Sequence, residues 1–492
     1  MGDVEYIKVG LKAGLEIHQQ LDTGKLFSRT PSLLRAEKPD YTIMRKLHKV
    51  AGESGEVDIA VKHEAGLDKE FYYQGYNDSI SLVELDEEPP REMDEEALDE
   101  AIKIAILLNC ELYPVAQIMR KTVIDGSNTS GFQRTVLIGH DGFLETSFGK
   151  VGIEGIALEE DAARIVEKDD KKSIYRLDRL GIPLVEISTA PDMNIAEQIK
   201  ETALKIGEIL RACKVKRGIG TIRQDLNISI KGHDRVEIKG FQEPRIMIKT
   251  TDLEIERQTK ELRGDNSTRP PTPKKKNGEV RNVLDDGTTE FLRPLPGKAR
   301  MYPETDLPLL KIGRERINRL KKELPKLRSE IRDELKKKGL SDELIILVLD
   351  GNLDEFELLL RVYNKDANLI GKMVALWRQE IASKIGKSID EIRLIVDEKV
   401  LERILEELVK GKISIGDIKN IMQDVASGKK VEDAIKIEKM DENEIEEEIR
   451  KIVKEKPGLR ENAYMGLVMA KMKGKINAQR AMEIIGKIVK EK

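Results

Sequence analysis

Residues 12–22 show the alternation of hydrophobic and polar positions that predicts a β-strand. Side chains alternate between the two faces of a strand, so Leu15 and Ile17 share one face while Glu16 and His18 point together from the other. A carboxylate and an imidazole on one surface can begin a divalent-cation site or an acid/base site. Taken alone, the pair also fits an amphipathic strand with a solvated face.

The next 220 residues or so alternate between strand and helix patterns. Short apolar runs at 70–74 and 79–85 predict strands. A helix should begin after Asp94, a good N-cap residue, because apolar side chains then recur at helical spacing up to Leu108. Residues 120–240 return to strand patterns with glycine-rich turns, interrupted by one helix at about 194–213. These elements predict a mixed sheet with a few helices.

A hairpin at 220–239 carries the densest group of charged side chains on one surface. Polar residues share one face of its two strands: Arg223, Asp225, Asn227, Ser229, Arg235, Glu237 and Lys239. Hard cations bind carboxylates, and phosphates bind Arg or Lys, so this surface can hold a triphosphate with magnesium. The sequence has no GxxxxGK[ST] loop, so a nucleotide would bind on the sheet rather than in a P-loop.

Further acids could complete a cation site on the same sheet. Glu159, Glu160 and Asp161 follow an apolar run, and adjacent acids repel one another unless a cation or an Arg lies nearby. An exposed helix start explains these three acids equally well. Glu186 lies inside the apolar run 182–187, where a charged residue usually has a partner.

Beyond residue 240 the sequence changes character twice. Proline, small polar residues and lysines at 263–278 predict a solvated linker. After Pro308 long amphipathic stretches rich in Lys and Glu, such as 340–360 and 435–453, predict helices without strands. The segment from Lys471 onward has seven basic residues against two acids, which fits either a phosphate-binding surface or a solvated helix face.

The overall composition bounds the class of protein. The chain has 492 residues, 39% of them hydrophobic, so it can bury large cores in two to four domains. It has neither a run of about 18 apolar residues nor a signal-peptide pattern, so we expect a cytoplasmic protein without a membrane span. Its two cysteines lie far apart, which predicts no cysteine-based zinc site. The net charge of −4 argues against general coating of nucleic acid.

Several motifs, taken in order, resemble one family over nearly the whole chain. The motifs are GLEIHQQL at 14–21, LVELDEEPP at 82–90, IDGSNTSGFQ at 124–133, LEEDAAR at 158–164, RPLPG at 293–297 and YMGLVM at 464–469. They are similar to those of the E subunits of archaeal glutamyl-tRNA(Gln) amidotransferases, which are relatives of the B subunits of bacterial Asp/Glu-tRNA amidotransferases.

This resemblance implies an α+β fold and an activity. The fold would be a mostly antiparallel sheet cradle at 1–310, a helical domain at 311–395 and a helical tRNA-binding tail at 396–492. The activity would be ATP-dependent phosphorylation of the glutamate side chain on mischarged glutamyl-tRNA(Gln), followed by displacement of the phosphate by ammonia. Ammonia would come from an asparaginase-like amidase subunit, in a heterotetramer of two amidase and two E-type subunits.

The resemblance also implies site residues, with ATP and Mg²⁺ as cofactors. The metal ligands would be Glu16, His18, Glu160, Glu186 and Asp225, of which all but Glu186 would be catalytic, with Glu159 and Asp161 close by. Contacts to ATP or the acyl substrate would come from Ser130, Gln133, Arg223, Lys239 and Arg293.

One departure and two alternatives accompany the resemblance. The E subunits usually carry an inserted domain, similar to one in bacterial aspartyl-tRNA synthetases, where this chain has only the linker at 263–278. The chain could instead be a B-type subunit or a tRNA-binding relative without catalysis. The acids retained at all the metal positions argue against the second alternative.

Overall fold

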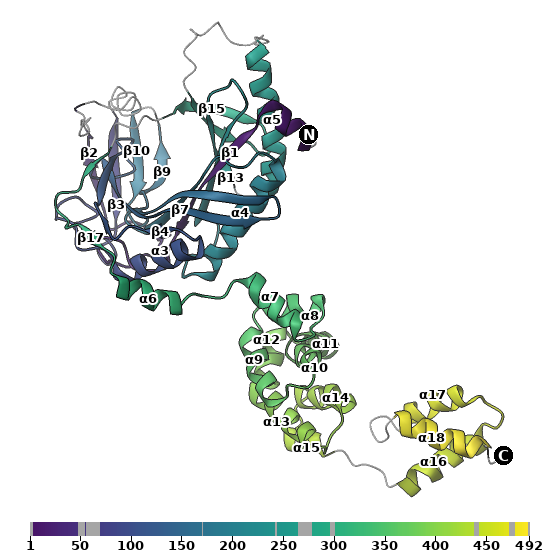
Figure 1. The fold of residues 1–492 in the computed structure, drawn as a ribbon. Coiled ribbons are helices and arrows are strands. Elements are labelled where there is room, and N and C mark those ends of the chain that lie inside the picture. Colours follow the sequence, from purple (N-terminus) through teal and green to yellow (C-terminus); the bar gives the residue numbers. More distant parts are fainter. Residues whose placement is uncertain are drawn as a thin grey trace. The chain divides into compact units, whose positions relative to one another are not determined.

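The structure is a computed structural model that forms two compact units, Met1–Leu327 and Arg328–Lys492 (Figure 1). It describes residues 3–47, 55, 69–169, 171–241, 244–263, 278–295, 301–436, 442–471 and 478–490. Within these ranges, all strands belong to the first unit and the second unit is helical. The predicted α+β class, a mostly antiparallel sheet followed by helices, is confirmed.

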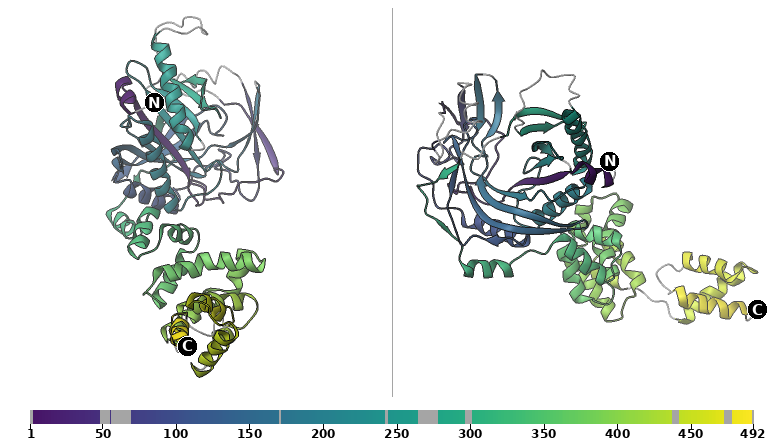
Figure 2. Two further views of the ribbon diagram at one scale, coloured as in Figure 1. Left: turned by 90° about the vertical axis from the view of Figure 1, so that its right-hand side faces the viewer. Right: turned by 45° about the horizontal axis from the view of Figure 1, so that its top comes forward.

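The first unit is organised around one large, curved sheet (Figure 2). Its order in the described ranges is β15 (Thr289–Pro294), β14 (Glu279–Val283), β13 (Val236–Phe241), β12 (Ile222–Ser229), β1 (Lys12–Gln20), β11 (Pro183–Thr189), β8 (Gly149–Glu160), β7 (Phe132–Thr146), β6 (Met119–Thr122) and β16 (Met301–Pro303), with β4 (Glu111–Leu112) beside β7. Neighbours are antiparallel except β13 and β14. The strand predicted at 12–22 is therefore confirmed as a central strand, β1.

Helices cover one face of this sheet (Figure 1). α3 (Glu95–Leu107) contacts β7 and β8, α4 (Ala196–Ala212) contacts β1 and β7, and α5 (Pro244–Arg263) contacts β12 and β13. Leu15 and Ile17 of β1 lie in the core that these helices close. Because side chains alternate along β1, Glu16 and His18 project from the opposite face. The same unit also holds α1 (Asp3–Val9) and α6 (Arg314–Lys322), of which α6 packs against α3.

Both helices predicted in this unit are confirmed. α3 begins after Asp94, whose side chain accepts a hydrogen bond from the backbone N–H of Ala97. α4 lies within the predicted region 194–213. The hairpin of β12 and β13 also forms as predicted.

A second, four-stranded sheet stands beside the large one. Its order is β2 (Tyr41–Arg45), β3 (Glu70–Gly75), β10 (Lys172–Arg176) and β9 (Arg164–Lys168), and it has its own aromatic core around Tyr73 and Tyr175. β3 confirms the strand predicted at 70–74. A short pair, β5 (Val115–Ala116) with β17 (Leu310–Lys311), completes the pairing.

The strand predicted at 79–85 is wrong, because this segment forms turns. Glu84 accepts hydrogen bonds from the backbone N–H of Ser81 at 2.8 Å and from its hydroxyl at 2.6 Å. It also lies 3.4 Å from the ammonium of Lys25, and both side chains are buried. A buried ion pair satisfied by local hydrogen bonds outweighs the strand preference of the neighbouring apolar residues.

The described residues of the second unit form two hydrophobic cores. The first is formed by α7 (Arg328–Lys337), α8 (Asp342–Leu349), α9 (Leu353–Val362), α10 (Ala367–Gly371), the π-helix η1 (Lys372–Trp377), α11 (Arg378–Ile385), α12 (Ile389–Ile395), α13 (Glu398–Val409), α14 (Ile415–Ala426) and α15 (Val431–Ile435). The second is formed by α16 (Glu442–Glu455), α17 (Glu461–Lys471) and α18 (Ala478–Lys490). The helical character predicted after Pro308 is confirmed, except that the two-residue strand β17 (Leu310–Lys311) comes first.

Some sequence-based boundaries fall outside what the structure describes. Residues 264–277 of the predicted linker and 437–441 of the predicted helix at 435–453 are outside the described ranges. The stretch 340–360 is two helices rather than one, separated at Gly351, whose positive φ of 80° suits glycine. The division into 1–310, 311–395 and 396–492 stays a prediction. No helix in the described ranges is long and apolar enough to span a membrane.

Candidate functional site

The pairing of β1 places acidic residues of two neighbouring strands beside Glu16 and His18. Glu16 lies opposite Asp225 of β12, and His18 lies opposite Glu186 of β11. Directly opposed residues of antiparallel strands have Cβ atoms about 5 Å apart on the same face. Residues that are about 210 positions apart in the sequence are thereby gathered on one surface.

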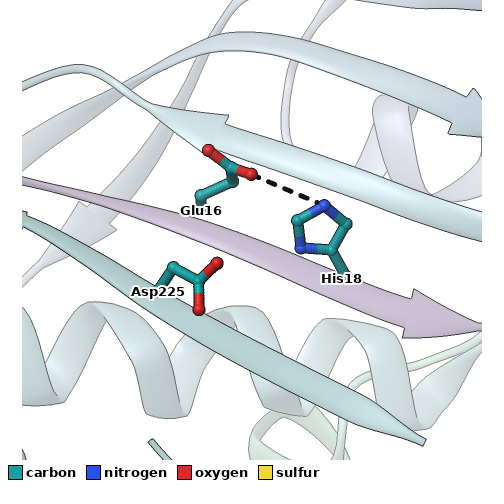
Figure 3. Close-up of side chains that lie close together, drawn as sticks. All are labelled: Glu16, His18 and Asp225. Carbon is teal, nitrogen blue, oxygen red and sulfur yellow. Dashed lines mark ion pairs between the residues drawn. The ribbon is translucent and has the colours of Figure 1, made fainter. Parts of the chain in front are cut away.

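His18 lies at the centre of this group. Its Nε2 atom is 3.5 Å from Glu16 Oε1, 3.4 Å from Glu186 Oε2 and 3.7 Å from Glu159 Oε1. Glu16, His18 and Asp225, shown in Figure 3, can each bring one ligand atom within 4.8 Å of the others, and so can His18, Glu159 and Glu186. We call these five residues the His18 cluster.

Lys121 of β6 provides positive charge to the His18 cluster in this structure. Its ammonium lies 2.8 Å from Glu159 Oε2 and 3.5 Å from Glu186 Oε2. Burial raises the pKa of Glu159, and the charge of Glu186 adds to that increase while Lys121 opposes it. Burial also disfavours the charged form of Glu186, but Lys121 and His18 outweigh it and lower the pKa of Glu186. The two neighbouring carboxyls therefore differ in their tendency to hold a proton.

Two further members of the cluster also have shifted pKa values. Burial lowers the pKa of His18, but its hydrogen bond to Glu186 and the charges around it outweigh burial, so the net shift is upward. Burial and the charge of Glu186 raise the pKa of Glu16. His18, Glu16 and Glu159 thus hold protons more tightly than isolated side chains would, as expected where several acids share a buried site.

Basic residues on β12 and β13 are held in place beside the cluster. Lys239 donates to Asp225 Oδ2 at 2.6 Å and lies 2.6 Å from Glu237 Oε1. Arg223 donates to Asp161 Oδ1 at 2.9 Å. His18, Gln133, Arg223, Asp225 and Lys239 line a common cavity of about 350 Å³ together with Glu159 and Asp161. This volume is within the range of small-molecule sites.

Glu160, unlike Glu159, is not brought into the His18 cluster. Adjacent side chains of a strand point to opposite faces, and the carboxylate of Glu160 lies 3.3 Å from Arg134 Nη1. Arg134 also donates to the buried Glu304 at 2.8 Å. The role of Glu160 as a metal ligand stays a prediction.

The other substrate-contact residues predicted from the sequence lie at three places. Gln133 lines the large cavity, and its amide donates to the backbone oxygen of Glu160 at 2.6 Å. Ser130 lies with Glu160 at a separate cavity of about 10 Å³, which has room for about one water. Arg293 is on the edge strand β15, opposite Val280. Only Gln133, Arg223 and Lys239 of the predicted contacts are therefore beside the cluster.

Comparison with known proteins shows the family. Residues 11–318 match the model of the GatB/GatE catalytic domain. The chain belongs to the GatB/GatE family. Three curated relatives are each named as the E subunit of glutamyl-tRNA(Gln) amidotransferase. That of Methanocaldococcus jannaschii is 36% identical, over 99% of this chain and 100% of the relative. That of Methanococcus maripaludis is 33% identical over 100% of both, and that of Pyrococcus furiosus is 36% identical over 83% of this chain and 87% of the relative.

The M. jannaschii relative is longer than this member of the GatB/GatE family. Its alignment with this chain spans 633 positions, whereas this chain has 492 residues. The relative therefore carries residues that have no counterpart here, which agrees with the expectation that this chain lacks an inserted domain.

The donor set of the His18 cluster fits a divalent cation. Four carboxylates and one imidazole can supply several oxygen ligands and one nitrogen, as hard divalent metals require. Burial is the largest cause of the raised pKa values of Glu16 and Glu159, the charge of Glu186 adds to it, and a bound cation would oppose both by favouring the charged carboxylates. Glu16, His18, Glu159, Glu186 and Asp225 would hold the Mg²⁺ that the GatB/GatE resemblance implies.

The sequence did not predict that Glu159 would lie in the His18 cluster of this GatB/GatE site, or that Lys121 would lie beside it. Glu159 was expected near the site but not among the ligands, although strand alternation puts Glu159 and Asp161 on one face and Glu160 on the other. Alternation along β8 is therefore a signal that could have found Glu159. Lys121 was missed because it reaches the cluster only through the pairing of β6 with β7, which no local pattern predicts.

Proposed function

We propose that this chain catalyses the ATP-dependent conversion of glutamyl-tRNA(Gln) to glutaminyl-tRNA(Gln) as an E-type subunit. The observation that carries the proposal is the His18 cluster beside a cavity lined by Arg223 and Lys239. The chain's relatives are named as E subunits of glutamyl-tRNA(Gln) amidotransferase, and those names favour the E-type alternative over the B-type one.

The chemistry solves the problem that a carboxylate is a poor acyl donor. The terminal phosphoryl group of ATP is transferred to the side-chain carboxylate of glutamate, which gives an acyl phosphate and ADP. Ammonia then attacks the acyl carbon, forms the amide and releases phosphate. A bound Mg²⁺ would neutralise charge on the phosphoryl oxygens.

The chain's own residues position the reactants and balance their charge. Lys239 holds the carboxylate of Asp225, and Asp161 holds the guanidinium of Arg223 toward the cavity. Arg223 and Lys239 can contact an incoming carboxylate or phosphoryl oxygen there. The ammonium of Lys121 lies beside Glu159 and Glu186 and balances part of their charge when no metal ion is bound.

The ammonia is expected from a partner. The sequence contains no arrangement of amidase-signature type and no plausible Cys-His pair. We propose an asparaginase-like amidase subunit as the source, in an assembly of two amidase and two E-type subunits.

The test is ADP release in the presence of mischarged glutamyl-tRNA(Gln) and Mg²⁺, with two neighbouring variants. Glu159→Gln removes a carboxylate of the His18 cluster and should reduce ADP release by about 100-fold, the usual order for loss of a metal ligand or its close support. Glu160→Gln serves as the matched comparison. Undiminished release by both variants would contradict the metal assignment, and a larger loss with Glu160→Gln would favour the ligand set predicted from the sequence.

A further inference from the structure

Two surface segments near the start of β12 expose apolar side chains. The first is 216–220, in which Ile219 is 100% exposed and lies between two glycines with positive φ. The second is 31–35, in which Leu33 and Leu34 are each about half exposed. An isoleucine that buries no surface gains nothing from the folding of this chain, whereas a bound ligand could cover it. We call the two segments together the Ile219 rim.

Hydrogen bonds hold the two segments of the Ile219 rim in place. The ammonium of Lys216 donates to the backbone oxygen of Ser32 at 2.7 Å and so joins the segments. The guanidinium groups of Arg164 and Arg176 donate to the backbone oxygen of Arg35 at 2.7 and 3.1 Å. The two leucines lie between these anchors in the sequence, so their backbone is fixed while their side chains are exposed. A preorganised surface of this kind loses little entropy when it binds a ligand.

The Ile219 rim also carries positive charge that no described carboxylate cancels by an ion pair. Arg217 is exposed, and its guanidinium donates to the backbone oxygen of Arg211. Arg176 donates to the side-chain oxygen of Gln74 in addition to the rim. Both guanidinium groups therefore have neutral partners among the described residues. Apolar side chains next to such cations match single-stranded nucleic acid, because its bases have apolar faces and its phosphates are anionic.

The rim lies close to where one end of the substrate must be. Arg223, near the start of β12, lines the cavity of about 350 Å³ and can contact the carboxylate of the glutamyl group there. In glutamyl-tRNA the glutamate is esterified to the 3′-terminal ribose, only a few bonds from that carboxylate. When the carboxylate is at Arg223, the terminal nucleotide is therefore within reach of the segment 216–220, which leads into β12.

We propose that the Ile219 rim binds the unpaired 3′ end of the glutamyl-tRNA. Ile219 and the two leucines would contact the faces of its bases, and Arg217 would contact its phosphates. This inference rests on the proposed function. A partner protein would also cover apolar side chains, but the cations without carboxylate partners and the short reach to Arg223 favour the nucleic acid.

The test compares the affinity of the full chain for uncharged tRNA(Gln) with and without its unpaired 3′ end. Ile219→Ser should weaken binding of the complete tRNA by about tenfold, the order expected for loss of one base contact, and leave binding of the truncated tRNA unaltered. Leu34→Ser should act in the same way but more weakly. Arg217→Gln should weaken binding of the complete tRNA alone and make its dependence on salt less steep.

Ile7→Ser is the matched control, because Ile7 is an exposed isoleucine on α1. It should bind both RNAs as the unmodified chain does. If Ile219→Ser also binds both as the unmodified chain does, or weakens both equally, the assignment of the rim is wrong. If the rim variants keep their affinity for RNA but no longer co-purify with an asparaginase-like amidase, the rim binds protein instead.

Failure of the proposed function is seen in a different measurement. If the unmodified chain releases no ADP with glutamyl-tRNA(Gln) and Mg²⁺, the proposed function is wrong, whereas the RNA affinities still decide whether the rim binds the 3′ end. If the unmodified chain releases ADP and Ile219→Ser has no selective effect on the complete tRNA, the proposed function stands and the inference about the rim does not.

Discussion

The ammonium of Lys121 lies between carboxylates that could also bind a divalent cation. Its ammonium contacts Glu159 and Glu186, and both of these carboxylates also lie within 4 Å of His18. Burial, together with the charge of Glu186, raises the pKa of Glu159 even though the charge of Lys121 opposes the shift. A metal ion bound by Glu159 and Glu186 would therefore compete with this ammonium for their oxygens.

The substitution Lys121→Met should show this competition. Without metal, the free energy of unfolding should fall by about 3 kcal/mol, because carboxylates that are mostly buried lose their partner. Added Mg²⁺ should stabilise the variant more than it stabilises the unmodified chain, since no ammonium has to be displaced. Thermal unfolding with and without Mg²⁺ measures both effects, with Lys8→Met as the control. An equal response to Mg²⁺ would show that Lys121 is remote from the cation.

The raised pKa values of His18, Glu16 and Glu159 predict how pH affects the metal-free chain. A group whose pKa is higher in the folded state stabilises the fold below its unfolded pKa, and this contribution is lost as pH rises through the folded value. The stability contributed by Glu16 and Glu159 should therefore decline as pH rises above 4.5, and that contributed by His18 should decline as pH rises above 6.5.

Binding of Mg²⁺ should show the complementary dependence on pH. The ion requires deprotonated ligands, so its affinity should increase with pH above 6.5 and binding should release protons. Calorimetry in two buffers of different ionisation enthalpy measures the proton release directly. No release, together with a constant affinity between about pH 6 and 8, would place the cation elsewhere.

Secondary-structure elements in this chain hold the cluster by different physical means. β1 is fixed by antiparallel partners on both sides and by a buried face against α4. α3 is fixed by its amphipathic pattern and by its cap, since Asp94 accepts a hydrogen bond from Ala97. α3 also supports β7 and β8, and β8 carries Glu159. A substitution at the start of α3 should therefore change the stability of the first unit and leave the rate of ADP release unchanged.

The substitution Asp94→Ala tests this separation. Loss of the cap should lower the free energy of unfolding of the first unit by about 1 kcal/mol. Asp94→Ser, which retains a capping oxygen, should recover most of that loss. Denaturant titration gives the stability, and ADP release at a temperature well below unfolding should be the same for all three proteins. A catalytic defect shared by both variants would mean that Asp94 does more than cap α3.

In the chain as a whole, the basic C-terminal segment is part of a folded element. α18 supplies Ala481, Ile484, Ile485 and Ile488 to the core it shares with α16 and α17. Deleting residues 471–492 would therefore unfold this core as well as remove charge. Lys471 is also paired with Glu448 at 2.8 Å, so its charge is partly neutralised. Single charge substitutions on the exposed face are the cleaner test of tRNA binding.

Lys487→Gln is such a substitution, because Lys487 is exposed on α18. If this face contacts tRNA phosphates, affinity should fall, and the dependence of log affinity on log salt should become less steep by about one unit or slightly less. Lys399→Gln, an exposed lysine on α13, is the control. The affinity for tRNA, measured at several salt concentrations, gives the slope for each variant. An identical slope in both variants would show that α18 presents an ordinary solvated face.

Local pattern was enough to predict several elements because the forces behind them are local. Strand alternation in β1 separates Leu15 and Ile17 from Glu16 and His18, whatever the rest of the chain does. Helical spacing and the cap at Asp94 predict α3 in the same way. The hairpin of β12 and β13 follows from two alternating strands and a short turn.

Contacts between residues far apart in the sequence decided the other features, because no local pattern predicts which side chains will meet. The buried pair of Lys25 and Glu84 turns the 79–85 segment away from a strand, and β6 carries Lys121 to Glu159. The sequence determined that acids and a histidine would share sheet faces, because side-chain alternation is a property of each strand alone. Alternation separates Glu159 from Glu160, but strand order and register decided that the face with Glu159 is the one that meets His18 and Lys121, and these exist only in the folded sheet.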